Sequence, residues 1–374
     1  MKVDFVYDAL DMKNRVLTGI DRKVLSQVDC LNRSGIECTL VSPPRAGKIA
    51  TLVQSLPFVQ DRTKWTDILE SNADAFYIRK SLYFSCQFVD FLERVKRNRP
   101  RSPILLEIPT YPYDAEMMNA KFGAVLLKDR HHRKRLKECV DAIVTVTDDK
   151  TIFGIPSIRM INGIDLNNIA CRKTGSGSEN AVDMICIASF WKAHGIDRMI
   201  SGLNTYQSSN PAREVNLHLL GSGPAIPELK KMTHDLRLEN HVRFYGQCNR
   251  KQMDEVFDRC SFAIEVLGAH RRDSNLVSSS LKSREYLAKG IPFVYSGEID
   301  VLMDNPVDFC LKVPSDESPV DINELLNFHD WLYSSYREDD LIARIRSYAE
   351  TYVSIDSTMK AVISYIKEKG EYER

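Results

Sequence analysis

Two series of short apolar runs, each separated from the next by a stretch long enough for a helix, constrain this chain most. In the first half these runs lie at 2–10 (KVDFVYDAL), 36–43, 73–79, 103–109 and 140–148. Apolar, β-branched runs that alternate with helical segments are typical of buried parallel strands. The pattern predicts an α/β lobe of the doubly wound kind.

The second half repeats this pattern. Its runs lie at 182–190, 215–223, 241–247, 262–268 and 291–297. A chain of 374 residues also exceeds what one core usually organises, since cores tend to split beyond roughly 250 to 300 residues. We therefore expect two doubly wound lobes.

The boundary between the lobes is predicted where glycine, serine and asparagine replace the apolar pattern, at 166–181 (LNNIACRKTGSGSENA). This segment is interpreted as a linker between a first lobe, 1–165, and a second lobe, 182–350. Apolar spacing between about 337 and 369 is helical, and residues 351–374 are expected to form a C-terminal helix.

Several classes of protein are excluded by composition. No apolar run approaches the roughly 20 residues that cross a bilayer, and the N-terminal residues lack the pattern of a signal peptide, so a cytoplasmic location is expected. The nine cysteines are scattered and never form a C-x-x-C pair. This predicts neither a disulfide framework nor a zinc site.

Ligands of open α/β sheets bind in loops that follow the carboxyl ends of strands. The first such loop runs from 11 to 20, and Gly19 lies where a helix is predicted to begin. A glycine there lets a phosphate approach backbone N–H groups at a helix N-terminus. An ordinary cap glycine is an equally good interpretation.

A second loop contains Gly221, Ser222 and Gly223 after a predicted strand. The third glycine of a dinucleotide-binding fingerprint is replaced by Ile226, which disfavours a nicotinamide or flavin enzyme. A tight turn that admits a nucleotide closely fits the same residues.

A third loop brings together Trp191, Lys192, His194 and Gly195. Lys192 is the candidate cation for charge on a departing diphosphate, because histidine is largely neutral at cytosolic pH unless its pKa is perturbed. The alternative is that Trp191 packs in the core and Lys192 is merely solvated.

The fourth and most specific stretch is 278–292 (SSSLKSREYLAKGIP), which predicts a helix capped by serine and ended by Gly290. Backbone amides near Ser280 and Leu281 would face a phosphate. Lys282 and Glu285, three residues apart, would share a face on which Glu285 accepts ribose hydroxyls. A salt-bridged surface helix is the alternative.

These motifs together resemble glycosyltransferase family 4, and they stand in the order expected for that family. They are TGIDRKVLSQVDCLNRSGIECTLV at 18–41, NGID at 162–165, HGIDRMI at 194–200, LHLLGSGP at 217–224, RFYGQ at 243–247 and SSSLKSREYLAKGIPFV at 278–294.

The resemblance implies a GT-B fold, in which two Rossmann-like lobes face a central cleft and the C-terminal helix returns to the first lobe. It implies a nucleotide-sugar donor bound by the second lobe, an acceptor on the first, retention of anomeric configuration, and neither cofactor nor metal. Glu285 matches the second glutamate of the E-x7-E motif, and Gly19 matches the glycine loop near the donor phosphates. Lys192 and Glu285 are the candidate catalytic residues.

The chain departs from the family pattern at two places. Val277 stands where the first glutamate of E-x7-E is expected, with Asp273 the nearest preceding carboxylate, and His194 stands where a phosphate-binding lysine is expected. Lys192 or Lys282 are the candidates for replacing that charge.

Candidate acceptor contacts follow the predicted strand at 103–109. Glu107, Thr110, Tyr111 and Tyr113 combine acidic and aromatic groups that suit a sugar ring. A rigid turn made by two prolines is an alternative interpretation of this segment.

Two basic runs, Arg94–Arg101 and Lys128–Lys137, lie in the predicted acceptor lobe. Such clusters attract anionic membranes by about 1 kcal/mol per residue, although a solvated helix face is the more frequent explanation. Nucleic-acid binding is set aside, because the net charge is zero and no reader motif is present.

The sequence and the resemblance therefore predict a retaining, metal-independent hexosyltransferase that moves a hexose from a UDP- or GDP-sugar to a polysaccharide, lipid-linked or other glycoconjugate acceptor. We expect it in the cytoplasm, at the inner membrane face. Two other functions stay open: a nucleotide-sugar epimerase on the same fold, and a non-catalytic nucleotide-sugar-binding partner subunit.

Overall fold

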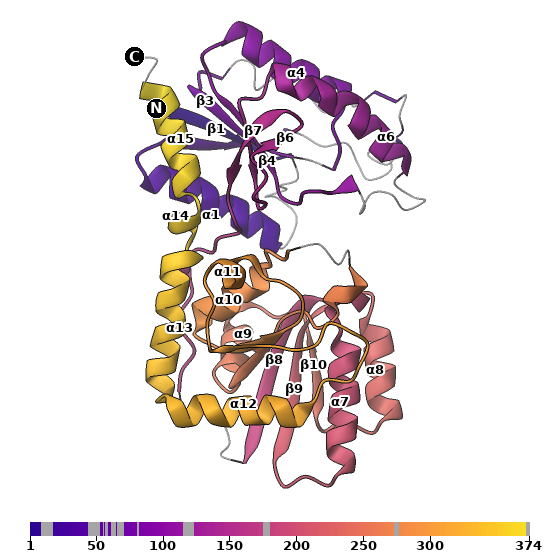
Figure 1. Cartoon of the computed structure of the whole chain (residues 1–374). Coiled ribbons are helices and arrows are strands. Elements are labelled where there is room, and N and C mark those ends of the chain that lie inside the picture. The colour runs from indigo at the N-terminus through magenta and orange to yellow at the C-terminus, as the bar shows by residue number, and fades with distance from the viewer. Residues whose placement is uncertain are drawn as a thin grey trace. The chain divides into compact units, whose positions relative to one another are not determined.

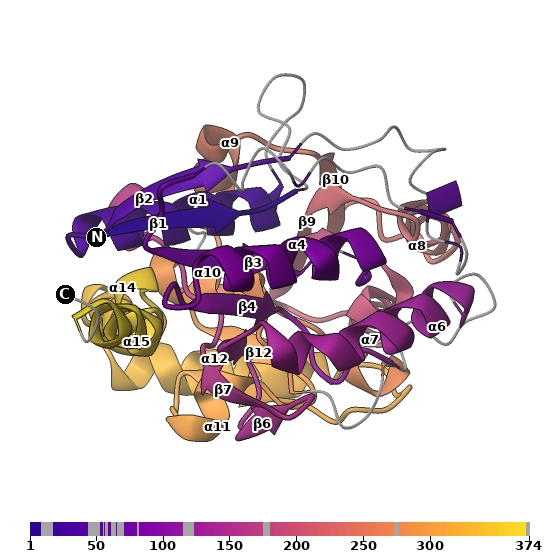
Figure 2. The same cartoon turned by 90° about the horizontal axis from the view of Figure 1, so that it is seen from above.

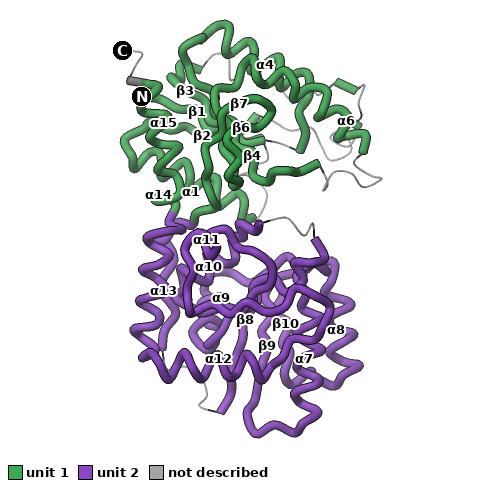
Figure 3. The backbone as a smooth tube through the Cα atoms, viewed as in Figure 1, with its two compact units in different colours: residues 1–163, 355–374 green, residues 164–354 purple. Residues whose placement is uncertain are grey.

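The fold consists of two compact units, residues 1–163 with 355–374 (unit 1) and residues 164–354 (unit 2), as Figure 3 shows. Residues 11–17 of the first candidate loop, 175–179 of the predicted linker, and Asp273 lie outside the part of the chain that is described. The computed structural model describes residues 1–8, 18–43, 53–54, 56, 59–60, 65, 71–80, 82–114, 123–174, 180–272 and 277–371.

Unit 1 contains a seven-stranded sheet in the order β2-β1-β3-β4-β5-β7-β6, in which every neighbouring pair is parallel except β6 and β7. Each run predicted as a strand in the first half contains one. The strands are β1 (Lys2–Val6), β2 (Glu37–Val41), β3 (Ala75–Arg79), β4 (Ile104–Ile108), β5 (Ala142–Thr145), β6 (Thr151–Ile152) and β7 (Ile155–Arg159).

The sheet of unit 1 is covered on both faces (Figure 1). On one face lie α4 (Cys86–Asn98) and α6 (Gly123–His132), which Figure 2 shows lying over the strands. On the other lie α1 (Gly19–Arg33) and the two C-terminal helices α14 (Ile355–Thr358) and α15 (Lys360–Glu371). Burial on both faces explains why the strand runs are continuously apolar.

Helix α1 begins where the sequence predicts. The side chain of Thr18 accepts a hydrogen bond from the backbone of Asp21, whose carboxylate accepts one from the backbone of Thr18. This capping box satisfies two N–H groups that would otherwise lack helical partners. Val24, Val28 and Leu31 then form the buried stripe that packs on the sheet.

Unit 2 contains a six-stranded, fully parallel sheet in the order β10-β9-β8-β11-β12-β13. Each run predicted as a strand in the second half again contains one. The strands are β8 (Ala181–Ser189), β9 (Glu214–Ser222), β10 (Val242–Gly246), β11 (Phe262–Ile264), β12 (Phe293–Tyr295) and β13 (Cys310–Lys312).

The helical tail predicted between 337 and 369 is divided between the units. Helix α13 belongs to unit 2 and packs against α10, whereas α14 and α15 belong to unit 1. The helices of unit 2 are α7 (Ile196–Ser208), α8 (Ile226–Asp235), α9 (Arg250–Phe257), α10 (Leu281–Lys289), α11 (Asp300–Asp304), α12 (Ile322–Ser335) and α13 (Glu338–Tyr352).

Candidate functional site

The order of strands in unit 2 marks the place where a ligand is expected. The chain runs from β8 through β9 to β10 toward one edge, and then returns to add β11, β12 and β13 on the other side of β8. The loops that leave β8 and β11 therefore lie at this switch point, which is where open α/β sheets bind ligands. The candidate site is built from these loops and the N-terminus of α10.

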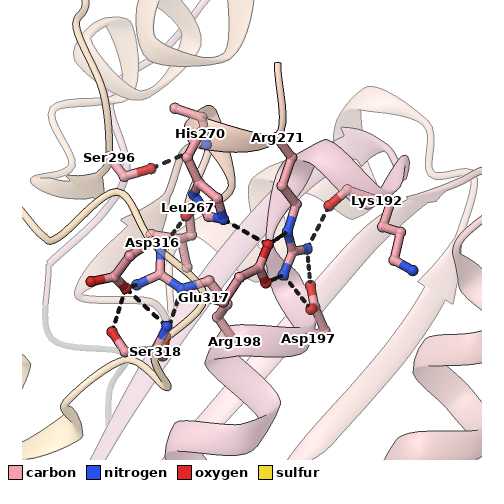
Figure 4. A network of polar contacts seen from close by, with 11 residues as sticks. Lys192, Asp197, Arg198, Leu267, His270, Arg271, Ser296, Asp316, Glu317 and Ser318 are labelled. Carbon is pink, nitrogen blue, oxygen red and sulfur yellow. Dashed lines mark hydrogen bonds and ion pairs between the residues drawn. The ribbon is translucent and has the colours of Figure 1, made fainter. Parts of the chain in front are cut away.

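The loop after β8 presents two predicted donor-binding residues to solvent. Trp191 is 60% exposed and Lys192 is exposed, so the alternative that Trp191 packs in the core is wrong. Figure 4 shows the Lys192 side chain pointing away from the neighbouring network. Its ammonium group has no hydrogen bond or ion pair within the described residues. Lys192 is thus available to an anionic ligand.

His194 has a different role in the same loop, because it is buried. Its Nδ1 accepts a hydrogen bond of 2.9 Å from the backbone N–H of Trp191. Burial, together with the nearby cations Lys282 and Arg272, lowers the pKa of His194 to about 4. His194 is neutral at pH 7 and cannot supply the positive charge of the phosphate-binding lysine whose place it takes.

Gly195 allows the loop after β8 to approach the loop after β11. It has φ +70°, and a Cβ there would lie 2.6 Å from the carbonyl carbon of Leu267 and closer still to the backbone nitrogen of Gly268. The backbone N–H of Leu267 donates to the carbonyl of His194 at 2.9 Å. The two loops are therefore fixed to each other at the switch point.

An arginine that the sequence does not mark as functional holds these loops in place (Figure 4). Arg271 donates to the two carboxylate oxygens of Asp197 at 2.7 Å each, to the carbonyl of Lys192 at 2.9 Å and to Glu317 at 2.9 Å. Such bidentate pairing fixes both distance and angle. The backbone from which Lys192 projects is therefore anchored.

Arg198 makes a second set of contacts in the same network. It is buried, and its guanidinium donates to the carbonyl of Ser318 at 2.6 Å and to the carbonyl of Leu267. Asp316 lies 3.3 Å away. Residues far apart in the sequence meet here, so no local pattern identified this network.

The predicted glycine turn after β9 packs on the loop after β8. The backbone N–H of Phe190 donates to the carbonyl of Ser222 at 3.0 Å. Gly223 has φ +159°, and a Cβ there would lie 2.5 Å from the nitrogen of Phe190. Gly221 is similarly confined against the backbone of Ala188. In the structure, these glycines allow the backbone of the turn after β9 to approach the backbone of β8 and the loop that follows it.

Helix α10 begins and ends as the sequence predicts. The hydroxyl of Ser280 accepts from the backbone N–H of Lys282 at 3.1 Å, and Gly290 ends the helix with φ +70°. Leu281, at the first helical position, is half-buried. Six of the nine helical residues are buried, so the interpretation as a surface helix is wrong.

Lys282 does not pair with Glu285 but turns toward Glu265, at the carboxyl end of β11. Its ammonium donates to the backbone carbonyl of Glu265 at 3.3 Å and lies 3.8 Å from its carboxylate. Both separations are longer than those of a strong charge-assisted hydrogen bond. Lys282 is therefore a partly exposed cation, loosely held beside the N-terminus of α10.

Glu265 is a charged residue that sequence reasoning missed. It is buried, and one carboxylate oxygen accepts from the backbone N–H of Val266 at 2.6 Å. Burial alone would raise the pKa of Glu265, but the Lys282 ammonium and the Ser280 hydroxyl outweigh it and hold this pKa below its usual value. An acid within the apolar run at 262–268 carries no pattern that reveals its partners.

Glu285 lies on α10, where its carboxylate contacts Arg250 at 2.5 Å. Glu285 is half-buried, so part of its side chain remains accessible. Val277, which replaces the first glutamate of the family motif, is 40% exposed.

In unit 1 the predicted residues do not gather in one exposed site. Gly19 is exposed at the start of α1. Glu107, expected in a loop, instead lies within β4 and is 1% exposed. The cause is an internal set of partners: Lys23 at 2.9 Å, Arg79, Gln27 at 3.1 Å and Tyr77 at 2.9 Å. Burial alone would raise the pKa of Glu107, but Arg79 and Lys23 lower it to about 2.

The remaining acceptor candidates differ in exposure. Tyr113 is buried, and its hydroxyl donates to Asp129 at 2.7 Å. Thr110 and Tyr111 are partly exposed, and the ring of Tyr111 packs against Phe153 at 5.8 Å between centroids. Only Thr110 and Tyr111 of the four predicted acceptor residues offer surface to a ligand.

Most cations of the run Lys128–Lys137 are engaged within unit 1. Lys128 is buried and donates to backbone carbonyls at 2.5 and 2.7 Å. Arg130 and Arg133 both contact Asp114, and Arg135 contacts acidic side chains of α4. These contacts explain the run as part of the fold.

In the run Arg94–Arg101, Lys96 contacts Asp141 at 2.8 Å, whereas Arg94, Arg97 and Arg101 are exposed. Across the described ranges, none of the helices combines the length and the apolar character that crossing a membrane requires.

No protein-family model matches the sequence, and no curated protein matches it. Solved structures do resemble it. Sucrose-phosphate synthase from Thermosynechococcus elongatus has a TM-score of 0.63 at 10% identity, over 100% of this chain and 98% of that one. HepE from Anabaena, in complex with UDP and glucose, has a TM-score of 0.63 at 11% identity, over 98% and 100%. A glycosyltransferase from Rickettsia africae has a TM-score of 0.62 at 10% identity, over 98% of each chain.

At these identities the likeness establishes the fold. The chain has the GT-B fold, with two parallel-sheet lobes and a C-terminal helix that belongs to the first. These three structural neighbours are GT-B glycosyltransferases.

Proposed function

We propose that the protein is a glycosyltransferase that moves a hexose from a nucleotide-sugar donor to a glycan or lipid-linked acceptor. One observation carries the proposal. Exposed Lys192, the capped N-terminus of α10 at Ser280, and Glu285 lie on elements that leave the carboxyl edge of the unit 2 sheet. Support comes from HepE, a protein of the same fold, which has been solved with UDP and with UDP-glucose.

The chemistry fits the charges at this edge. In the transfer, the bond between the sugar C1 and the donor phosphate oxygen breaks. An acceptor hydroxyl oxygen bonds to C1 and loses its proton. The leaving nucleoside diphosphate gains negative charge, which Lys192, Lys282 and the backbone amides at Ser280 and Leu281 would stabilise. Glu285 would accept hydrogen bonds from the ribose.

Retention of configuration and independence from metal and cofactor belong to the proposal through the resemblance to glycosyltransferase family 4. Lys282 in the first turn of α10 and Lys192 in the loop after β8 would supply the kind of positive charge that a divalent cation otherwise brings to a diphosphate. UDP- and GDP-sugars are the proposed donors.

On the acceptor side, we assign the contact to Thr110 and Tyr111, because they are the partly exposed members of the predicted set. The exposed cations Arg94, Arg97 and Arg101 support a peripheral contact with an anionic membrane surface at the cytoplasmic face. An acceptor of the polysaccharide or lipid-linked type would be presented at such a surface.

The proposal is tested by incubating the full chain with UDP- and GDP-sugars and a panel of glycan acceptors, with EDTA present. The expected result is acceptor-dependent release of one nucleoside diphosphate, retained with EDTA and lost in Lys192→Met. Conversion of the donor to another nucleotide sugar without an acceptor product would instead identify an epimerase.

A non-catalytic nucleotide-sugar-binding partner is the second candidate. The observation that favours it is Val277, which places an apolar side chain where the family motif has a carboxylate. This candidate predicts binding of a nucleotide sugar with no transfer to any acceptor. Val277→Glu would then leave binding intact and produce transfer where there was none.

A further inference from the structure

The helices α9 and α10 of unit 2 are joined by two charge pairs. Arg250 and Asp254 stand four residues apart on α9, and Glu285 and Lys289 stand four apart on α10. Arg250 contacts Glu285 at 2.5 Å and Asp254 contacts Lys289 at 2.7 Å. Residues four apart share a helix face, so the two pairs form successive rungs between the helices.

The two pairs differ in burial and therefore in what they can do. Lys289 is buried and also donates to the backbone carbonyl of Ala170 at 2.9 Å, which makes its pair with Asp254 a structural contact. In the other pair, the Arg250 side chain is 35% exposed and that of Glu285 is 19% exposed. Both members of the Arg250–Glu285 pair are thus partly exposed, whereas in the other pair Lys289 is buried and Asp254 is 36% exposed.

Arg250 is well placed to orient Glu285. It is the first residue of α9, which Asn249 caps by accepting from the backbone N–H of Gln252 at 3.0 Å. Its other contacts are longer: Asp254 at 3.7 Å and the carbonyl of Asn168 at 3.5 Å. Glu285 is therefore its principal partner, and the guanidinium fixes where that carboxylate lies.

Arg250 occupies one oxygen of the Glu285 carboxylate, Oε1. The second oxygen, Oε2, has no partner among the described residues. An ionised carboxylate only accepts hydrogen bonds, and the vicinal hydroxyls of a ribose are donors of matching geometry. The pair thus presents one oriented acceptor at the edge of the sheet where the donor is proposed to bind.

We propose that Arg250 is a positioning residue that makes the site selective for ribonucleotides. By holding Oε1 of Glu285, it presents Oε2 to the 2′- and 3′-hydroxyls of the nucleoside diphosphate. This inference rests on the proposed function, because it assigns Glu285 to the ribose of the donor. If Arg250 has this role, its removal should abolish the preference of the site for nucleotides with ribose over those with dideoxyribose.

The test is calorimetry of the full chain with UDP, GDP and ADP and with their 2′,3′-dideoxy forms. In the wild type, one nucleoside diphosphate binds and its dideoxy form binds about 10-fold or more weakly. In Arg250→Met, affinity for the ribose form falls by about 10-fold while affinity for the dideoxy form changes less than about twofold. In a Glu285→Gln background, Arg250→Met has no further effect.

Lys251→Met is the matched control, since Lys251 is an exposed cation beside Arg250. This variant should prefer the ribose form over the dideoxy form as strongly as the wild type does. Equal loss of both forms in Arg250→Met, or discrimination that survives in that variant, overturns the role of Arg250. If the wild type binds none of the nucleoside diphosphates, the proposed function itself fails.

Discussion

Charged side chains at the carboxyl edges of the two sheets have different surroundings. In unit 1, Glu107 is enclosed, and its carboxylate contacts Lys23 and Arg79. In unit 2, Lys192 is exposed and Lys282 contacts Glu265 only at 3.3 and 3.8 Å. Charged side chains at equivalent edges are thus paired with one another in unit 1. In unit 2 they remain available to a ligand.

This difference separates the charges that stabilise the fold from those that can bind a ligand. Burial of an ion pair costs desolvation that only close partners offset, so breaking such a pair is strongly destabilising. An exposed or loosely held charge contributes little to stability and can turn to an incoming phosphate. Substitutions in unit 1 should therefore change stability, and substitutions in unit 2 should change ligand binding.

The largest effect is expected from Glu107→Gln. It removes the carboxylate shared by Lys23 and Arg79, and should destabilise unit 1 by about 3 to 5 kcal/mol. Trp65, buried in unit 1, reports the transition by fluorescence in a background where the other two tryptophans are phenylalanine. Glu138→Gln, at an exposed acid of the same unit, is the control. Unaltered stability of Glu107→Gln would show that this carboxylate is not structural.

The acid sensitivity of unit 1 should trace to the same group. The pKa of Glu107 is lowered to about 2 in the folded chain, against about 4.3 for an unfolded glutamate. Its stabilisation is present above the unfolded pKa and is lost as pH falls from about 4.5 toward about 2, by about 3 kcal/mol in all.

Urea midpoints of unit 1 between pH 2.5 and 6 measure this loss. Other carboxylates titrate too, so the difference between wild type and Glu107→Gln isolates the contribution of Glu107. The wild-type advantage should shrink as the pH is lowered. If the stabilities of the wild type and Glu107→Gln instead fell in parallel with pH, the acid sensitivity could not be assigned to Glu107.

In unit 2, Lys192→Met should reduce transfer by about 100-fold, which corresponds to about 2.7 kcal/mol. The reason is loss of positive charge beside the leaving diphosphate. Because its ammonium has no contact within the described residues, the melting temperature should stay unchanged. Lys251→Met controls for charge in general. A fall in melting temperature that matches the loss of turnover would assign Lys192 to the fold.

A smaller effect is expected from Tyr113→Phe, which removes the buried hydrogen bond to Asp129. The loss should be about 1 to 2 kcal/mol of unit 1 stability, measured by the Trp65 signal. Nucleotide affinity should not change. A selective loss of acceptor binding without destabilisation would restore Tyr113 as an acceptor contact.

Local patterns were enough to predict most of the fold. Strands buried on both faces leave nearly continuous apolar runs, which is why β1 and β4 were located from the sequence pattern alone. The residues of β7 and β13 are mostly half-buried or exposed, so neither strand carries such a run.

Candidate site residues could be named from the sequence where they are contiguous, and could not where they come from separate segments. The segments around Lys192 and Ser280 are single loops or helix starts, so their charged and capping residues can be recognised from neighbouring positions in the sequence. Arg271 gains its role only by meeting Asp197 and Glu317 in three dimensions. Glu107 was misplaced for the same reason, because its partners come from α1 and β3.

Hydrogen–deuterium exchange of the full chain, with and without UDP, GDP or ADP, tests most directly whether the edge of the unit 2 sheet binds the donor. One nucleotide should slow exchange at 190–195 and at 277–285, while the peptides around Glu107 remain unchanged. Protection confined to unit 1, or no protection by any of the three nucleotides, would contradict the account.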